Sequence, residues 1–163
     1  KYEAGTVIDL VMKGGASAVF HGMSEEDIKR IMQYPFNMFG SDATIRTFGV
    51  GMPHPRGYGT NARVLAEYVR DQKVISLEEA IRRMTSLPAQ KFQLKDRGLI
   101  KEGMAADIVI FDEKEVQDVS TYENPHAYSK GFHFVIVNGV LTVENEKHNG
   151  TRPGHALYGP GYH

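Results

Sequence analysis

The sequence has no cysteine and no long hydrophobic run. Without cysteine, the chain can form neither a disulfide framework nor a thiolate zinc site. No run approaches the ~20 apolar residues that a membrane-spanning helix requires. The N-terminus also lacks the basic and apolar regions of a signal peptide. These absences make the cytoplasm the expected location.

A strong charge of either sign is also missing, since 19 basic and 20 acidic residues give a net charge of −1. This balance leaves no electrostatic footprint for nucleic acid or for an anionic membrane surface. We therefore expect neither of these partners. The content of 41% hydrophobic and 24% charged residues over 163 positions is typical of a globular protein, either one domain or parts of two.

The first part of the chain alternates helical and strand-like patterns. Apolar spacing predicts a helix over 6–13, and Ser24 is typical of the cap of a second helix that Pro35 ends. Short apolar runs at 16–20 and 36–39 indicate buried strands. This pattern favours a parallel α/β layer, yet two strands are too few for an independent sheet. Because the chain also begins at Lys1 without methionine, we expect residues upstream of it.

Residues 40–59 hold five glycines and two prolines and predict a long loop, which in a compact domain is often functional. A helix is expected over 61–70. A second helix is expected to begin at the capping box that runs from Ser76 to Glu79, and a short helical turn is expected at 88–92.

The pattern changes near Lys95. Apolar runs at 106–111, 134–137 and 140–143 predict strands, and Asn138-Gly139 is a strong hairpin signal. The tail, 149–163, is expected to be irregular.

Three residues of the long loop stand out as candidates for chemistry. Asp42 follows an apolar run within Gly-Ser-Asp, where α/β proteins place catalytic groups. A turn aspartate is the alternative. His54 and Arg56 follow in Pro-His-Pro-Arg, whose prolines restrict the backbone. The guanidinium of Arg56 could bind a substrate carboxylate through two parallel hydrogen bonds. The alternative is that Arg56 only forms an ion pair on the surface.

His21 follows the first expected strand and could point into the same site, although a lone histidine there is more often a packing residue. The remaining histidines lack the spacing of metal ligands, and we expect most of them to be solvated: His126, His133, His148, His155 and His163.

These motifs resemble a known family. The sequence GSDA at 40–43, HPR at 54–56 and TNARVLAEYVRD at 60–71 are similar to the end of the barrel in N-acyl-D-amino-acid deacylases, the D-aminoacylases. IRRMTSLPAQKFQLKDRGL at 81–99 is similar to the helices that follow in that family. GLIKEGMAADIVIFD at 98–112 and VIVNG at 135–139 are shared more widely across the amidohydrolase superfamily.

The resemblance implies an α/β fold in two parts. Residues 1–95 would form the C-terminal βα units of a (β/α)₈ metal-dependent hydrolase barrel. Residues 96–163 would form part of a small β-sandwich domain and a C-terminal tail. In this family the aspartate matched by Asp42 contacts zinc, takes a proton from the attacking water and passes it to the departing amine. The arginine matched by Arg56 faces the substrate carboxylate, and His54 and His21 are further candidates for substrate binding.

The function implied is hydrolysis of the amide bond of N-acyl-D-amino acids, with zinc as cofactor. The other metal ligands of the family lie upstream of the residues present, so we expect the isolated chain to be inactive without the N-terminal barrel segment. Two alternatives stay open. One is an amidohydrolase that acts on cyclic amides. The other is a non-catalytic module that assembles as a homo-oligomer or with a partner.

Overall fold

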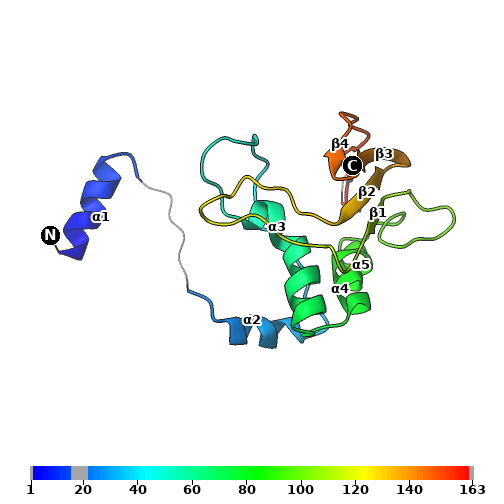
Figure 1. Cartoon of the computed structure of the whole chain (residues 1–163), viewed down its shortest axis with the longest axis horizontal. Coiled ribbons are helices and arrows are strands. Elements are labelled where there is room, and N and C mark those ends of the chain that lie inside the picture. The colour runs from blue at the N-terminus through cyan, green and yellow to red at the C-terminus, as the bar shows by residue number, and fades with distance from the viewer. Residues whose placement is uncertain (1, 16–21, 162–163) are drawn as a thin grey trace.

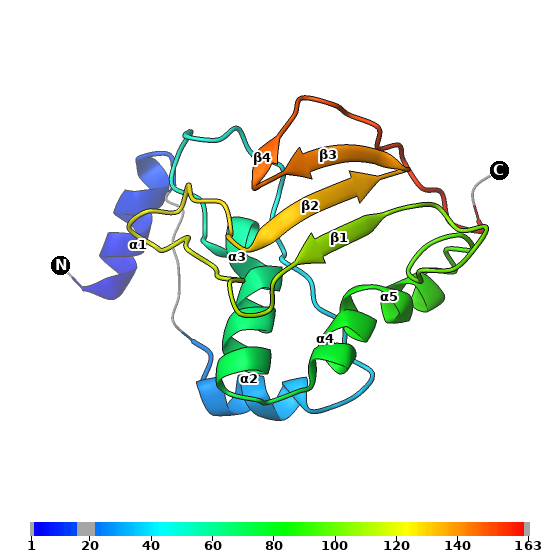
Figure 2. The ribbon, with the colours of Figure 1, turned by 45° about the vertical axis from the view of Figure 1, so that its right-hand side comes forward.

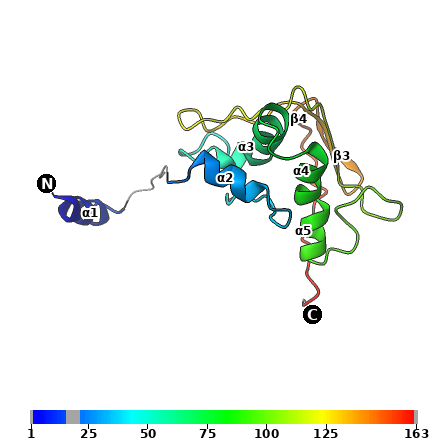
Figure 3. The same cartoon turned by 90° about the horizontal axis from the view of Figure 1, so that it is seen from below.

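The computed structural model describes residues 2–15 and 22–161, which form a group of helices beside a small antiparallel sheet (Figure 1). Helix α1 (Glu3–Met12) lies apart from the other elements in Figures 1 and 3 and buries none of its residues. It confirms the helix expected over 6–13. No helix in the described part of the chain is long and apolar enough to cross a membrane.

Helix α2 (Glu25–Met32) begins as predicted, because the Ser24 hydroxyl accepts a hydrogen bond from the Asp27 N–H at 3.1 Å. The strand expected at 36–39 is wrong: these residues form a turn and then an irregular segment. No described strand pairs with them, and an isolated strand leaves its backbone groups unpaired. The strand expected at 16–20 lies outside the described residues.

Helix α3 (Arg56–Arg63) continues directly into a π-helical segment, η1 (Val64–Asp71). The predicted loop therefore ends at Pro55, and the helix begins well before residue 61. Gly59 lies inside α3, where the absence of a side chain allows Asp118 to approach the helix closely. A Cβ at this position would stand 3.0 Å from the Cβ of Asp118.

Helices α4 (Leu77–Met84) and α5 (Ser86–Lys91) follow. The Ser76 hydroxyl accepts from the Glu79 N–H at 3.2 Å and confirms the predicted cap. The sheet then forms in the order β1 (Ile108–Phe111), β2 (Phe132–Val137), β3 (Val140–Glu144) and β4 (Lys147–His148), with every neighbouring pair antiparallel.

The hairpin between β2 and β3 forms where the sequence predicts it. Asn138 and Gly139 have φ angles of 48° and 77°. Two consecutive left-handed residues match the twist of the flanking strands, and asparagine and glycine adopt this conformation most readily. The tail confirms its prediction up to residue 161, since residues 149–161 contain no helix or strand.

The hydrophobic core lies between the helices and the sheet. Figure 2 shows α3, α4 and α5 on the same side of the strands. The core residues come from α3, η1, α4 and the segment after β1: Ala62, Val64, Leu65, Val69, Ala80 and Val116. These contacts span both sides of the boundary between residues 95 and 96, and the division into 1–95 and 96–163 stays a prediction. The result is an α/β fold with a small antiparallel sheet.

One apolar face is left uncovered. A groove of about 660 Å³ runs between the helices α4 and α5 and the edge strand β1. Leu99, Ile100 and Val109 line it and are exposed. In the described part of the chain, β1 pairs with β2 alone.

Candidate active site

Asp42 lies on the irregular segment between α2 and α3, with its backbone in the left-handed region at φ 48°. Aspartate and asparagine adopt that region more readily than other non-glycine residues, because their short side chains bond locally. Oδ2 of Asp42 lies 2.8 Å from Nη2 of Arg56, the first residue of α3. The fold therefore brings together two of the site residues predicted from the sequence.

This ion pair is open to solvent, since the side chains of Asp42 and Arg56 are 87% and 45% exposed. An exposed pair of this kind contributes only about 0–1 kcal/mol to stability. A guanidinium carries five N–H donors, so the pair leaves Arg56 with donors for a second anion. The arrangement suits binding better than it suits stabilisation.

His54 supports the start of α3. Its Nδ1 lies 3.0 Å from the backbone nitrogen of Arg56, and its Nε2 lies 3.2 Å from the hydroxyl of Tyr122. The backbone N–H can only donate, so Nδ1 is the acceptor and the neutral ring carries its proton on Nε2. Both ring nitrogens are engaged within the protein. His21, the remaining site residue predicted from the sequence, lies outside the described residues.

A zinc site is not complete within the part of the chain that the structure describes. Among these residues, no group of three or more histidine, cysteine, aspartate or glutamate side chains is placed to hold a metal ion. A zinc site needs three or four such ligands. Asp42 could supply a single carboxylate, and the other ligands would have to come from elsewhere.

A cavity of about 490 Å³ opens beside the start of α3. On its wall, Arg63 pairs with Asp118 at 3.3 Å. The hydroxyl of Tyr68 donates to Glu25 at 3.1 Å. Burial, reinforced by the Glu25 carboxylate, raises the pKa of Tyr68. These polar groups satisfy one another, whereas Arg56 lines the same cavity with its guanidinium exposed.

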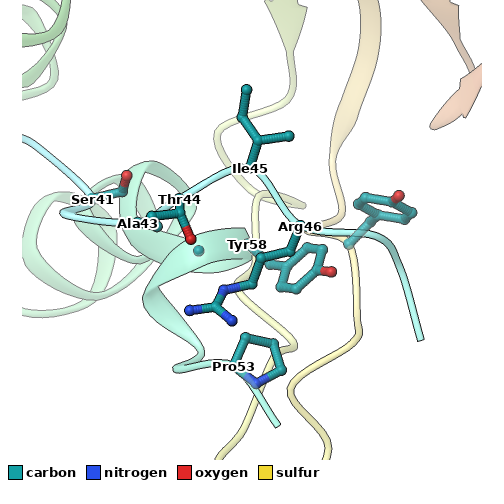
Figure 4. Close-up of a pocket in the computed structure, with 9 residues that line it drawn as sticks. Ser41, Ala43, Thr44, Ile45, Arg46, Pro53 and Tyr58 are labelled. Atoms are coloured by element: carbon teal, nitrogen blue, oxygen red, sulfur yellow. The ribbon is translucent and has the colours of Figure 1, made fainter. Parts of the chain in front are cut away.

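A second cavity, of about 400 Å³, is lined by residues of the loop before α3 and by Tyr58 and Tyr128 (Figure 4). Figure 4 shows the guanidinium of Arg46 beside Pro53 and Tyr58, with the hydroxyl of Thr44 nearby. Polar donors set against an apolar wall are typical of cavities that bind small organic molecules.

Sequence reasoning missed Tyr122 and His126, and it expected most of the remaining histidines to be solvated. His126 is an exception to that expectation: it is half-buried, and its Nδ1 lies 3.1 Å from both the Gly49 nitrogen and the Tyr58 hydroxyl. The available signal was the aromatic content of 122–128, a stretch with no helical or strand period. Aromatic rings supply large apolar contact area, and a tyrosine hydroxyl usually finds a hydrogen-bond partner when it is buried.

The sequence is similar to that of known amidohydrolases. The profile of the Amidohydrolase family matches residues 4–143. An N-acyl-D-aspartate deacylase of Alcaligenes xylosoxydans xylosoxydans is 40% identical over 142 residues, which cover 87% of this chain and 28% of that protein. A D-aminoacylase of the same organism is 38% identical over 142 residues and is covered to 29%. The chain thus spans less than a third of the length of these curated relatives.

Solved structures agree with the sequence comparisons. A D-aminoacylase crystal structure superimposes with a TM-score of 0.72 at 40% identity, covering 79% of this chain and 27% of that one. The N-acyl-D-glutamate deacylase of Bordetella bronchiseptica, complexed with zinc and a phosphonate mimic of the tetrahedral intermediate, has a TM-score of 0.67 at 41% identity. That match covers 74% of this chain and 25% of the deacylase.

Proposed function

This chain belongs to the amidohydrolase family, and on that premise we propose that it supplies the C-terminal part of a zinc-dependent N-acyl-D-amino-acid deacylase. The polypeptide that contains it would hydrolyse an N-acyl amide to a carboxylate and a free D-amino acid. The observation that carries the proposal is the ion pair between Asp42 and Arg56 at 2.8 Å. It joins an acid–base group to a carboxylate-binding group at one point of the surface.

The uncovered apolar face supports the fold that goes with this function. We propose that residues 1–95 complete a (β/α)₈ barrel and that residues 96–163 form part of a β-sandwich domain. The groove beside β1 and the unpaired edge of that strand are surfaces that further barrel or sandwich elements would cover. The missing N-terminal barrel segment and a small N-acyl amino acid are the proposed partners, and the cytoplasm is the proposed location.

Asp42 is the proposed acid–base residue. Its carboxylate would accept a proton from the attacking water as the new C–O bond forms. It would then deliver that proton to the amide nitrogen as the C–N bond breaks, so that the amine departs neutral. Zinc held by ligands outside the described residues would lower the pKa of a bound water to about 7, and Asp42 would add at most one ligand.

Arg56 is the proposed anchor for the substrate α-carboxylate. A carboxylate that binds its free N–H donors would compete with Asp42 for the guanidinium. Binding of the substrate would also fix the position of its carbonyl relative to Asp42, which lowers the entropic part of the barrier. His54 and His21 remain candidates for substrate binding.

The test is Asp42→Asn in the complete polypeptide, assayed with N-acetyl-D-amino acids. Asparagine tolerates the left-handed backbone of Asp42 but cannot accept the proton, so we expect turnover to fall by about 10²- to 10⁴-fold with the fold intact. Asp96→Asn is the matched control. It removes a carboxylate that is also exposed (62%) and also pairs with an arginine, Arg97, at 3.8 Å. Turnover by Asp42→Asn within a few-fold of the control would show that Asp42 is only a turn residue.

A further inference from the structure

The segment between β1 and β2 contacts the loop that carries the proposed site. Residues 117–130, which we call the brace, are closed at their ends by hydrogen bonds in both directions between the backbones of Gln117 and Lys130, at 3.2 and 2.9 Å. Figures 1 and 2 show this yellow segment passing the cyan loop before α3. A segment with fixed ends can hold a second loop in place with little additional loss of entropy.

His126 of the brace binds the loop at two glycines. Its Nε2 lies 2.9 Å from the carbonyl oxygen of Gly51, which can only accept, so Nε2 carries the proton. Its Nδ1 then accepts from the Gly49 N–H and from the Tyr58 hydroxyl, both at 3.1 Å. Gly49 and Gly51 have φ angles of 80° and 73° with open space at the Cβ position. The two glycines thus provide the backbone conformation in which one imidazole meets both peptide groups.

Tyr122 of the brace binds the loop at its other end. Its hydroxyl lies 3.2 Å from Nε2 of His54, and the two rings meet edge to face with centroids 5.1 Å apart. Nδ1 of His54 accepts from the backbone N–H of Arg56 at 3.0 Å. A continuous chain of contacts therefore leads from Tyr122 through His54 to the first residue of α3, whose guanidinium pairs with Asp42.

Aromatic packing reinforces both connections. Phe48 stacks on Tyr128 with centroids 4.9 Å apart and an interplanar angle of 20°, and it meets Tyr58 edge to face at 6.0 Å. The Ser129 hydroxyl donates to the Tyr58 carbonyl at 2.9 Å. The loop from Phe48 to Arg56 is therefore held by the brace along most of its length, whereas Asp42 is highly exposed.

We infer that Tyr122 and His126 are positioning residues for the deacylase reaction: they hold the loop so that Arg56 meets the substrate carboxylate within reach of Asp42. This inference rests on the proposed function. Neither side chain needs to touch the substrate, because Tyr122 acts through His54 and His126 acts through the loop backbone. The C-terminal part of the chain thereby sets the geometry of a site whose acid–base and anchoring residues precede it.

The test compares conservative variants in the complete, zinc-loaded polypeptide. Tyr122→Phe keeps the ring and removes one hydrogen bond, which is worth about two- to ten-fold. We expect the KM for N-acetyl-D-amino acids to rise by about that factor, with kcat nearly unchanged. The KM for the corresponding carboxamides should not move, since they offer Arg56 no carboxylate. Tyr34→Phe is the control, because Tyr34 is an exposed tyrosine whose ring meets only that of Phe36 among the described contacts, tilted at 43°.

Substitutions at His126 separate its two roles. Asparagine can replace the acceptor Nδ1, and glutamine can replace the donor Nε2, whereas alanine removes both. We expect kcat/KM to fall by about ten- to a hundred-fold in His126→Ala and by less in His126→Asn and His126→Gln, with zinc content and the unfolding temperature close to wild type. His148→Asn is the control, since His148 is exposed and accepts only from the Gly150 N–H among the described contacts.

The outcomes distinguish this inference from the function on which it rests. If Tyr122→Phe and the His126 variants match wild type while Asp42→Asn is impaired, the positioning role is wrong and the deacylase proposal holds. If the variants lose zinc or fold in proportion to activity, with kcat/KM per zinc unchanged, their role is structural and the inference is again overturned. If the wild type does not hydrolyse N-acetyl-D-amino acids, the proposed function fails and the inference fails with it.

Discussion

Removing the charge of Glu79 should destabilise the junction between α2 and α4, because Glu79 is the ionic partner of the buried Arg83. The Arg83 side chain is 2% exposed, and its Nε donates to Oε1 of Glu79 at 2.7 Å. Its Nη1 donates to the Met32 carbonyl and, at 2.7 Å, to Oδ1 of Asn37. These contacts fasten the end of α2 and the beginning of the irregular segment that leads to the proposed site.

The size of the effect follows from burial and charge. Removing one partner of a buried ion pair costs about 3–5 kcal/mol. Hydrogen bonds from Arg82 and Arg83 lower the pKa of Glu79 from 4.5 to about 2, and a difference of that size corresponds to about 3 kcal/mol at neutral pH. The Glu79 side chain is 27% exposed, so water screens part of the interaction. We expect Glu79→Gln to lower the free energy of unfolding by about 2 kcal/mol.

Urea unfolding followed by circular dichroism would measure this loss. Glu78→Gln is the matched control, because it removes the same charge from the same helical turn at an exposed position with no arginine partner in the described structure. The stabilisation from Glu79 is complete above pH 4.5 and is lost as the pH falls toward 2. The cost of Glu79→Gln should therefore disappear over that range. Equal losses for the two variants at pH 7 would refute the reasoning.

Three further predictions concern the site, the fold and the metal. Arg56→Ala should raise KM about ten- to a hundred-fold for substrates with a free carboxylate and leave carboxamides unchanged; equal losses in a kinetic assay would indicate a structural role. Gly131→Ala should lower the free energy of unfolding by about 3 kcal/mol more than Gly150→Ala does, as urea unfolding would measure. Both glycines have positive φ, but only at Gly131 would an added Cβ clash, because it would stand 2.5 Å from the Val116 nitrogen. The 163-residue chain alone should hold no stoichiometric zinc and hydrolyse no N-acyl amino acid, and about one equivalent of zinc with activity would contradict this.

Local signals in the sequence were reliable. Ser24 and Ser76 cap helices, and Asn138-Gly139 makes a hairpin, because each depends on residues only a few positions away. The apolar run at 36–39 failed as a strand because a strand depends on neighbours that the local sequence does not specify. The predicted start of the long helix is too late because the glycines and prolines of 40–59 together favour a loop, whereas Gly57 and Gly59 lie inside α3, where Gly59 packs against Asp118.

In the candidate site, too, the residues that belong to short motifs were predicted and those that depend on distant contacts were not. Asp42 and Arg56 were predicted from short motifs, and their ion pair follows from a loop that folds back on itself. Tyr122 and His126 were not predicted, because their partners are 68 and 77 positions away in the sequence. Contacts at that separation depend on how the sheet and the helices pack, and no short motif encodes them.

The left-handed backbone at Asp42 has an evolutionary consequence. If Asp42 has the proposed acid–base role, a substitution that removes the role need not disturb the local backbone. Asparagine is a single-base change from aspartate and also adopts positive φ readily, so the change would keep the backbone of the loop and remove only the charge that pairs with Arg56. If the proposed function holds, a lineage that no longer needed hydrolysis could therefore keep this surface as a binding site for N-acyl amino acids. A natural homologue with asparagine at this position should bind such a ligand without consuming it.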